Sequence, residues 1–416
     1  MKEYSSWEYL LIDVANNHHT KLDKTTFETR IEWAKANLDR LEDEAKDRIW
    51  KTRPLYLKAC MAIRDTQKGE PIGHLVGMDA VNSGMQIMSV VTGCISGARA
   101  TGLIDTNERA NAYEQCRNVM SQLLGSAVEV DEALVKKSVM TSLYGSEKEP
   151  EKAFGKGTAE LAAFEEALFI VAPGAVELLS VLLASWQSNA LSHTWIMPDG
   201  WTVDNKVTVK TNHQIEVDEL DHHTFDYTYY RSEALPRAKK NAANVTHSID
   251  AYVLRAMIAR TNFDEVEIQE IDHWIMSVLM DRSFGKAVVP ITDEHIIKYQ
   301  KHYMRSGMPD MSICNALTEA NVHQLTTKHL KELRRILTAM RHYGAFEMIT
   351  IHDDYKAHPN NMNAVRFHYK EILAELADSR IIEDIINQIY GVDNLTISKL
   401  TPDLSQHIRN SNYHLS

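Results

Sequence analysis

Two short apolar runs in the sequence end in aspartate: residues 73–80 (GHLVGMDA) carry Asp79, and residues 346–353 (FEMITIHD) end in Asp353. Turn chemistry alone can explain such residues, because Asp bonds its own backbone in turns. If the two runs are neighbouring strands of one sheet, however, the carboxylates converge and raise each other's pKa. A divalent cation removes that penalty, and oxygen-only ligands favour Mg²⁺. Paired ions of this kind are the usual device for in-line phosphoryl transfer.

The segment between these aspartates, residues 131–146 (DEALVKKSVMTSLYGS), has helical spacing. Lys136, Met140 and Tyr144 recur at i, i+4 and i+8, so they project from one face of a helix. A cation, an apolar platform and an aromatic ring in a row suit a nucleoside triphosphate, with the phosphates at Lys136. Gly145 then lets a backbone or a base pair approach closely. The alternative is an amphipathic helix whose lysine extends along the surface.

Composition sets broad limits on the function. The chain has 416 residues, of which 44% are hydrophobic and 25% charged, and its net charge is −12. This charge is not typical of a nucleic-acid-binding protein, although the segments 231–248 and 327–342 are basic. The four cysteines are far apart and fit a reducing compartment. The histidine-rich segments NNHHT and LDHHTF lack a matching pair at zinc-ligand spacing.

Helical periodicity dominates the chain, and strand patterns are few. The most apolar stretch, residues 167–186, is broken by Pro173-Gly174 and carries Glu177, which indicates two buried helical segments and no membrane partner. Residues 197–217 contain Asp199-Gly200 followed by alternating apolar positions, a pattern typical of a β-ribbon. The sequence therefore predicts an α+β fold that is predominantly helical, with a small sheet assembled from distant segments.

Four segments resemble, in order, the motifs of the single-subunit, bacteriophage-type RNA polymerases, which include the mitochondrial enzymes. DAVNSGMQ (79–86) resembles the first palm motif, and KKSVMTSLYGS (136–146) resembles the fingers motif. NVTHSIDAYVLRAM (244–257) resembles the segment that ends the fingers, and IHDDYKAH (351–358) resembles the second palm motif. Residues 16–41 also resemble the stretch that opens the palm of these enzymes. Four motifs in the family's order make a specific signal.

The resemblance implies a catalytic centre that uses two Mg²⁺ ions. Asp79 and Asp353 would be the metal-binding catalytic carboxylates, and the carbonyl oxygen of Ala80 would be a further metal ligand. Lys136 would hold the triphosphate and protonate the departing pyrophosphate. The implied reaction is DNA-templated RNA synthesis by two-metal nucleotidyl transfer, with a DNA template, rNTPs and an RNA product.

The resemblance also implies a nucleotide-binding surface. Tyr113 falls where the family has a phosphate-contacting tyrosine, and Tyr144 and His247 would read the 2′-hydroxyl of the ribose. Related DNA polymerases have a bulky Glu at the position of Gly84 and an aromatic residue at the position of Met140. Both residues of this chain leave room for a ribose, which favours RNA synthesis over DNA synthesis.

The implied architecture is a right-hand polymerase palm with helical fingers. Residues 1–107 would form the N-terminal part of the palm and residues 108–247 the fingers, including a nucleotide-binding helix at 132–146 and a β-ribbon at about 197–232. Residues 248–416 would complete the palm, with an inserted helical segment at about 260–335. The basic end of this insertion, residues 328–342, is a candidate contact for nucleic acid.

The chain departs from the family at several positions. Glu132 stands where the family has a triphosphate-binding arginine, so that contact is missing or comes from another residue such as Lys137. Asp354 replaces a small residue, and Lys356 follows it. The chain lacks the family's N-terminal domain and thumb, and no Asp-x-x-Gly-Arg element occurs in it. It therefore resembles the larger subunit of a split, heterodimeric phage polymerase, whose smaller subunit carries that element, in the cytoplasm of an infected bacterial cell.

Three other functions compete with this interpretation. A DNA polymerase with the same palm would share the two aspartates, but Gly84 and Met140 argue against it. A two-metal nuclease or phosphohydrolase could also use Asp79 and Asp353, yet it would not need the Lys136 face or His247. A non-catalytic scaffold subunit would not need to keep both aspartates. A split enzyme further predicts an exposed apolar patch on this chain, where the partner binds.

Overall fold

The computed structural model describes residues 1–46, 49–105, 109–125 and 130–416. Helices dominate the described chain, and the strands form small antiparallel sheets. This confirms the mostly helical secondary structure with small sheets that the sequence predicts. The boundary expected between residues 107 and 108 lies outside the described residues.

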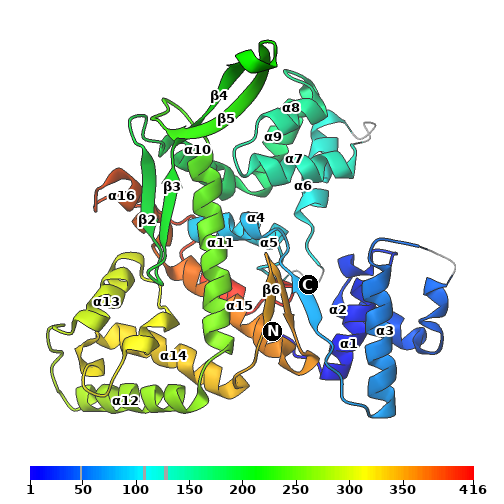
Figure 1. The fold of residues 1–416 in the computed structure, drawn as a ribbon. Coiled ribbons are helices and arrows are strands. Elements are labelled where there is room, and N and C mark those ends of the chain that lie inside the picture. Colours follow the sequence, from blue (N-terminus) through cyan, green and yellow to red (C-terminus); the bar gives the residue numbers. More distant parts are fainter. Residues whose placement is uncertain (47–48, 106–108, 126–129) are drawn as a thin grey trace.

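A small antiparallel sheet lies near the centre of the molecule (Figure 1). Its strand order is β1 (Val76–Asp79), β7 (Asp354–Ala357) and β6 (Ile349–Ile351). The two strands expected from the sequence, β1 and β6, are thus not direct neighbours, because β7 lies between them. The sequence analysis did not predict β7, since this short strand follows immediately on a two-residue turn.

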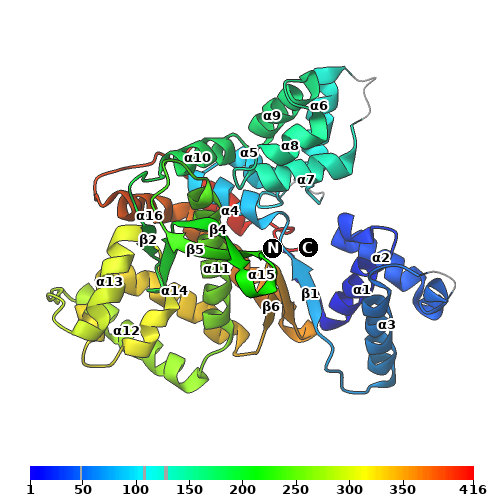
Figure 2. The ribbon, with the colours of Figure 1, turned by 45° about the horizontal axis from the view of Figure 1, so that its top comes forward.

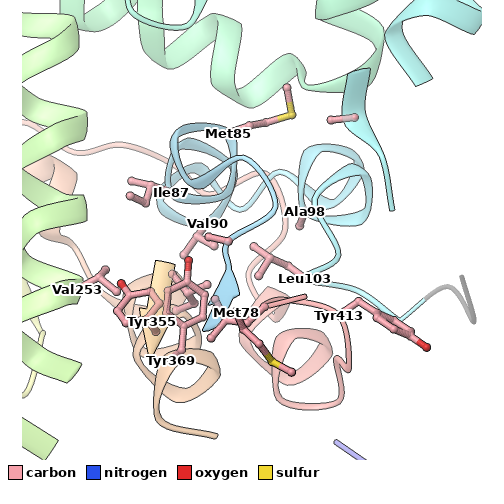
Figure 3. Packing of buried hydrophobic residues seen from close by; sticks show 14 of the residues in the cluster. Met78, Met85, Ile87, Val90, Ala98, Leu103, Val253, Tyr355, Tyr369 and Tyr413 are labelled. Atoms are coloured by element: carbon pink, nitrogen blue, oxygen red, sulfur yellow. The ribbon is translucent and has the colours of Figure 1, made fainter. Parts of the chain in front are cut away.

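One face of this sheet is buried against three long helices, α4 (Ser83–Thr92), α11 (Lys240–Thr261) and α15 (Met362–Asp378). Tyr355 of β7 is fully buried there, and its ring centroid lies 5.2 Å from that of Tyr369 on α15. Figure 3 shows Val253 of α11 beside these two tyrosines. Large buried aromatic side chains contribute strongly to core stability. The packing therefore fixes the sheet and, with it, the direction in which β1 and β6 end.

A lobe of three helices lies beside the free edge of β1: α1 (Ser6–Asn16), α2 (Phe27–Ala36) and α3 (Arg53–Lys68) (Figures 1 and 2). The last residues of the chain also lie against β1. The amide of Ser416 donates to the carbonyl oxygen of Asp79 over 3.0 Å, and the buried guanidinium of Arg30 donates to the Ser416 hydroxyl over 2.8 Å. These bonds tie the N-terminal lobe and the C-terminal segment to the end of β1.

A second lobe holds the segment that resembles the fingers. It contains α5 (Ile95–Ala100), α6 (Ala112–Leu124), α7 (Glu132–Ser142), α8 (Lys148–Phe154), α9 (Ala159–Val171) and α10 (Pro173–Ala184). The helix predicted at 132–146 is therefore shorter at its C-terminal end. Gly145 follows in a turn with φ of 86°, which ends the helix because a glycine tolerates this left-handed conformation.

The most apolar stretch of the chain forms α9 and α10, as two helical segments. Their axes are bent by 106° at the break before Pro173. Phe164, Leu168 and Leu178 of this pair are buried in the main hydrophobic core. Within the described residues, no single helix has the length and apolar composition needed to cross a membrane, and only this bent pair passes that test jointly.

Two β-hairpins follow the second lobe. β2 (Ser192–Ile196) pairs with β3 (Thr202–Lys206), and β4 (Thr208–Val217) pairs with β5 (His223–Ser232). The β2–β3 hairpin is partly buried, with Trp195 in the core. The β4–β5 hairpin instead projects from the body of the molecule, and the residues of β5 are exposed along their whole length (Figure 1).

Residues 265–343 contain a separate hydrophobic core. Three helices build it: α12 (Glu265–Ser283), α13 (Glu294–Ser306) and α14 (Thr327–Tyr343). Ile275, Leu333 and Leu337 are among its fully buried residues. The remaining helices, α16 (Ile381–Tyr390) and α17 (Leu404–Arg409), lie near the C-terminal end of the chain.

Charged side chains attach this helical segment to the rest of the molecule. Arg335 of α14 pairs with Glu371 of α15 over 2.9 Å and also with Glu375, which in turn pairs with the buried Arg260 of α11 over 2.5 Å. Arg341 pairs with Asp272 of α12. Much of the positive charge in the segment 327–342 is thus neutralised by carboxylates inside the fold, which argues against a role for these two arginines in binding nucleic acid.

Candidate active site

The His-Asp pair at the end of the apolar run 346–353 forms the turn of the β6–β7 hairpin. Ile351 of β6 pairs with Asp354 of β7, so His352 and Asp353 are the two turn residues. His352 has φ of 56°, a left-handed conformation that is uncommon for a residue with a side chain. Two-residue hairpins favour positive φ at this first position, because it matches the twist of the strands. The tight turn therefore fixes where Asp353 lies.

The hairpin brings Asp353 to the end of β1. The chain runs antiparallel in β1 and β7, so the turn before β7 lies at the same sheet edge as Asp79. The amide of Ala80 donates to the carbonyl oxygen of Asp353 over 3.1 Å. Although the two predicted strands are not neighbours, their ends converge as the sequence suggested.

Carboxyl groups crowd this edge of the sheet. Burial, followed by the negative charges of the neighbouring Asp353 and Asp354, raises the pKa of Asp79 to about 7. The pKa of Asp250, on α11, is raised to about 6 by burial and by Asp353. Without a cation the negative charges repel each other, so these carboxyl groups keep their protons up to an unusually high pH. This is the electrostatic pattern expected of a site that binds positive charge.

A cavity of about 350 Å³ opens next to these carboxylates. It brings together most of the residues that the sequence analysis selected. Its walls include Asp79, Ala80, Gly84, Tyr113, Lys136, Met140, Tyr144 and Asp353. The side chain of Met140 is 46% exposed and forms part of the open wall. Carboxylates and a lysine in one wall would allow the cavity to hold an anion bridged by cations.

Lys136 and Tyr113 are in contact in the wall of this cavity. The Nζ atom of Lys136 lies 5.4 Å from the centre of the Tyr113 ring, a cation–π geometry that orients the ammonium group. Burial, followed by the charge of Asp353, raises the pKa of Tyr113 to about 12, so its hydroxyl remains a hydrogen-bond donor. The two side chains together present donors to an anionic ligand.

Tyr144 packs directly against the backbone of Gly84. A Cβ atom at position 84 would lie 2.5 Å from the Tyr144 hydroxyl oxygen, which is closer than van der Waals contact allows. The ring of Tyr144 also lies 4.7 Å from that of His247, measured between centroids. Burial lowers the pKa of His247, so its imidazole is neutral near pH 7. Gly84 and Tyr144 thus line the cavity, and His247, which is not one of the lining residues, packs against Tyr144.

Two of the selected residues lie elsewhere. Lys137 is turned away from the cavity and pairs with Glu149 of α8 over 2.5 Å. Gly145 lines a different cavity, beneath α8 and α9, together with Leu183 of α10. The structure therefore does not bring Lys137 to the place where the missing arginine contact was expected.

Other cations reach the cavity instead, and the sequence analysis did not select them. Lys24, just before α2, lines the cavity and pairs with Glu132 over 3.2 Å. Arg109 lines it as well and donates to the Ser416 hydroxyl over 2.8 Å. Lys24 lies in the family-like stretch 16–41 and Arg109 lies four residues before Tyr113, but no sequence pattern assigned a role to either residue. Asp250 was recognisable, since it lies one helical turn after His247 in a quoted motif.

The residues at the sheet edge fit a hard divalent cation. Asp79, Asp353 and the main-chain carbonyl of Ala80 offer oxygen ligands alone, the set that Mg²⁺ prefers. Burial and the neighbouring carboxylates raise the pKa of Asp79, and the nearby Arg109 offsets this effect only in part. Among the described residues, Glu216, Asp218 and His222 also lie within 4.8 Å of one another, but they are exposed near the tip of the β4–β5 hairpin and far from the carboxylate pair in sequence.

Comparison with known families agrees with the first half of this site. Residues 2–154 match the family model of DNA-dependent RNA polymerase. The matched segment contains Asp79, Lys136 and Tyr144, whereas His247 and Asp353 lie beyond it. No curated protein matches the chain.

The match supports this family and indicates an enzyme, a DNA-directed RNA polymerase and hence a nucleotidyltransferase. Polymerases of this family depend on metal ions, typically Mg²⁺, and the family implies a DNA template and NTP substrates. The match covers less than half of the chain and ends before residues 265–343 and 351–358.

Proposed function

We propose that this chain is the catalytic subunit of a phage-type RNA polymerase that acts by two-metal nucleotidyl transfer. The observation that carries the proposal is the single cavity shared by Asp79, Asp353, Lys136 and Tyr144. These side chains come from strand β1, the β6–β7 turn and a helical lobe, which are far apart in sequence. In this proposal the sheet with α4, α11 and α15 is the palm, and the α6–α10 lobe is the fingers.

Asp79, Asp353 and the carbonyl oxygen of Ala80 would hold the metal ions. Two bound Mg²⁺ ions would neutralise the phosphates and activate the attacking 3′-hydroxyl. The role of the chain is to hold the two carboxylates at a fixed separation. The β6–β7 turn and the bond from the Ala80 amide to Asp353 support that role, because they leave the backbone of both ligands little freedom.

Lys136 would bind the triphosphate and give a proton to the departing pyrophosphate. Its ammonium group lies near the Tyr113 ring, which keeps it directed into the cavity. The Tyr113 hydroxyl would donate to the same phosphates. Lys24 and Arg109 are available at the same cavity, and they would replace the contact that Glu132 cannot make. General acid catalysis of this kind contributes about 10²–10⁴-fold to a rate.

Tyr144 and His247 would select the ribose. Both are neutral hydrogen-bonding groups near pH 7, since burial raises the pKa of Tyr144 to about 12 and lowers that of His247. Gly84 supports this function because only a residue without a side chain leaves space for the Tyr144 hydroxyl. Met140 adds an apolar wall that does not crowd the sugar.

The chain would work with a smaller subunit that carries the Asp-x-x-Gly-Arg element and the thumb. Exposed apolar side chains support this part of the proposal: Ile49 is 86% exposed and Met61 of α3 is 66% exposed, both in the N-terminal lobe. If this lobe binds the partner, the purified chain alone should extend primers poorly. Processive transcription by the chain without any partner would refute the split-enzyme proposal.

The competing functions differ in what they require of this cavity. A DNA polymerase of the same architecture would accept dNTPs at least as well as rNTPs. A two-metal nuclease would degrade the primer and would not use NTPs. The test is a primer-extension assay with Mg²⁺, an RNA-primed DNA template and either rNTPs or dNTPs, in the presence and absence of a candidate small subunit. Extension with rNTPs supports the proposal, whereas a preference for dNTPs or net degradation of the primer contradicts it.

A further inference from the structure

A second cavity, of about 480 Å³, lies on the other side of Asp79. It forms a groove between the central sheet and the N-terminal lobe. The sheet contributes Asp79, Asp354, Lys356, Ile349 and Ile351 to its wall, and the lobe contributes Leu55, Lys58, Asp13 and Asp23 among others. This groove and the cavity that holds Lys136 meet at Asp79 and Arg109, which line both of them.

The register of the sheet explains why these side chains share one face. Asp79 of β1 pairs with Asp354 of β7, which pairs with Ile351 of β6. Two residues along, Gly77 pairs with Lys356, which pairs with Ile349. Side chains directly opposite each other on neighbouring strands point to the same face. The open face of the sheet therefore presents a carboxylate row beside Asp79 and a lysine in the next row.

Asp354 and Lys356 form an ion pair that lies across Gly77. The Lys356 Nζ atom is 3.1 Å from the Asp354 carboxylate, and both side chains are partly exposed, at 27% and 29%. A Cβ atom on Gly77 would lie 2.8 Å from an Asp354 oxygen and 3.4 Å from the Lys356 chain. The absence of a side chain at position 77 thus gives the pair its place on the sheet.

Asp354 adds a third carboxylate beside Asp79 and Asp353, the two proposed metal-binding aspartates. Asp354 lies directly opposite Asp79 and contributes to its raised pKa. A nucleic-acid strand that entered the groove would bring phosphates towards this extra negative charge. Lys356 is the cation paired with that charge. Together with Lys58 and Arg109, which also line the groove, it supplies the positive charge that can attract a phosphate.

In-line transfer indicates which strand would occupy the groove. The attacking and leaving oxygens lie on opposite sides of the transferred phosphorus. If the triphosphate occupies the cavity with Lys136, the strand that ends in the attacking 3′-hydroxyl must approach from the other side of Asp79. The groove lies on that side.

We propose that Lys356 binds a backbone phosphate of the product strand next to its 3′ end, and that Asp354 holds Lys356 in place before the strand arrives. This inference rests on the proposed function. It assigns to the β7 strand a phosphate contact made by a lysine that follows the His-Asp turn.

The test measures binding, so that it does not depend on catalysis. The full chain is titrated into a fluorescent RNA–DNA primer–template whose RNA strand ends in a 3′-deoxynucleotide, at several salt concentrations. Lys356→Met should weaken binding on the order of tenfold, because a charged hydrogen bond to phosphate is lost. It should also lower the slope of log K against log salt by about one, because one phosphate contact is lost. Lys286→Met is the matched control, since it breaks another Lys–Asp pair, with Asp281 over 2.7 Å, in the α12 region.

A double variant separates a phosphate contact from simple neutralisation of Asp354. If Lys356 binds phosphate, Asp354→Asn combined with Lys356→Met should keep the reduced salt slope. If Lys356 only compensates Asp354, the double variant should regain the slope of the unchanged protein, and the proposal is overturned. An unchanged slope in Lys356→Met also overturns it. Extension of primers by the unchanged protein together with a candidate small subunit shows that the proposed function stands in either case. Absence of both extension and binding when that subunit is present overturns the function and this inference together.

Discussion

Replacing Gly84 with alanine tests the contact that seats Tyr144 in the nucleotide cavity. The added Cβ atom would lie 2.5 Å from the Tyr144 hydroxyl oxygen and 3.2 Å from the ring carbon that carries it. Ordinary contact between such atoms begins near 3.4 Å, so the phenol must move by about 1 Å. The ring can move, because the cavity beside it is open. We therefore expect little loss of stability and a large loss of activity.

The size of the effect follows from this displacement. A misplacement of about 1 Å in a substrate-positioning group can lower a rate on the order of 10²-fold. The same substitution should be much milder in a Tyr144→Phe background, where the nearest remaining atom is the ring carbon at 3.2 Å. There the ring needs to move only a few tenths of an ångström, and we expect a loss of about threefold.

The assay is a double-mutant cycle on primer extension. kcat/KM for rNTPs and for dNTPs is measured for the unchanged protein, Gly84→Ala, Tyr144→Phe and the double variant. Tyr144→Phe alone should lower the preference for rNTPs by about tenfold, since one hydrogen bond to the ribose is lost. Melting temperatures serve as the control for folding. An effect of Gly84→Ala that is equal in both backgrounds would refute the reasoning, because the two sites would then be independent.

Two further predictions concern charge. Burial and the neighbouring Asp353 and Asp354 raise the pKa of Asp79 to about 7, so the metal-free folded state holds this proton more tightly than the unfolded chain, whose Asp pKa is about 4. Metal-free protein should lose stability as the pH rises from about 4 to 7. Mg²⁺ should raise the melting temperature more at pH 8 than at pH 5, because at pH 5 it must displace a proton from Asp79. Equal Mg²⁺-induced shifts of the melting temperature at both pH values would contradict this prediction. Glu375→Gln should lower the free energy of unfolding by about 3–5 kcal/mol in urea titrations, because it leaves the buried Arg260 without its carboxylate. The matched control is Glu332→Gln, because Glu332 also pairs with Arg335 but its side chain is 38% exposed. This variant should change the free energy of unfolding by less than about 1 kcal/mol. Equal losses in the two variants would count against this account.

The sequence predicted those site residues that belong to a local pattern of residue types and spacing. Asp79 and Asp353 were predicted because two apolar runs each end in aspartate and flank the segment that carries Lys136, and the structure brings those ends together. Lys136 and Met140 were found from helical spacing, which survives although α7 ends at Ser142, before Tyr144. Local patterns of this kind do not depend on the rest of the fold.

The sequence was less informative where the outcome depends on tertiary contacts. Strand β7 is four residues long, and Asp354 and Lys356 on its open face give it the appearance of a polar loop. Lys137 was selected as an anion-binding residue, yet its position on α7 directs it to Glu149. Lys24 reaches the cavity only because the N-terminal lobe folds against β1, which no local pattern in the sequence indicates.

The central claim is that Asp353 holds a catalytic metal ion in an RNA polymerase. The most direct test is RNA-primed extension with Mg²⁺ and rNTPs by Asp353→Asn, compared with the unchanged protein and with Asp226→Asn, which removes a carboxylate from the exposed strand β5. Asp353→Asn should abolish extension while its melting temperature and its binding to the primer–template stay close to those of the unchanged protein. Asp226→Asn should retain extension. Full extension activity in Asp353→Asn would contradict the account.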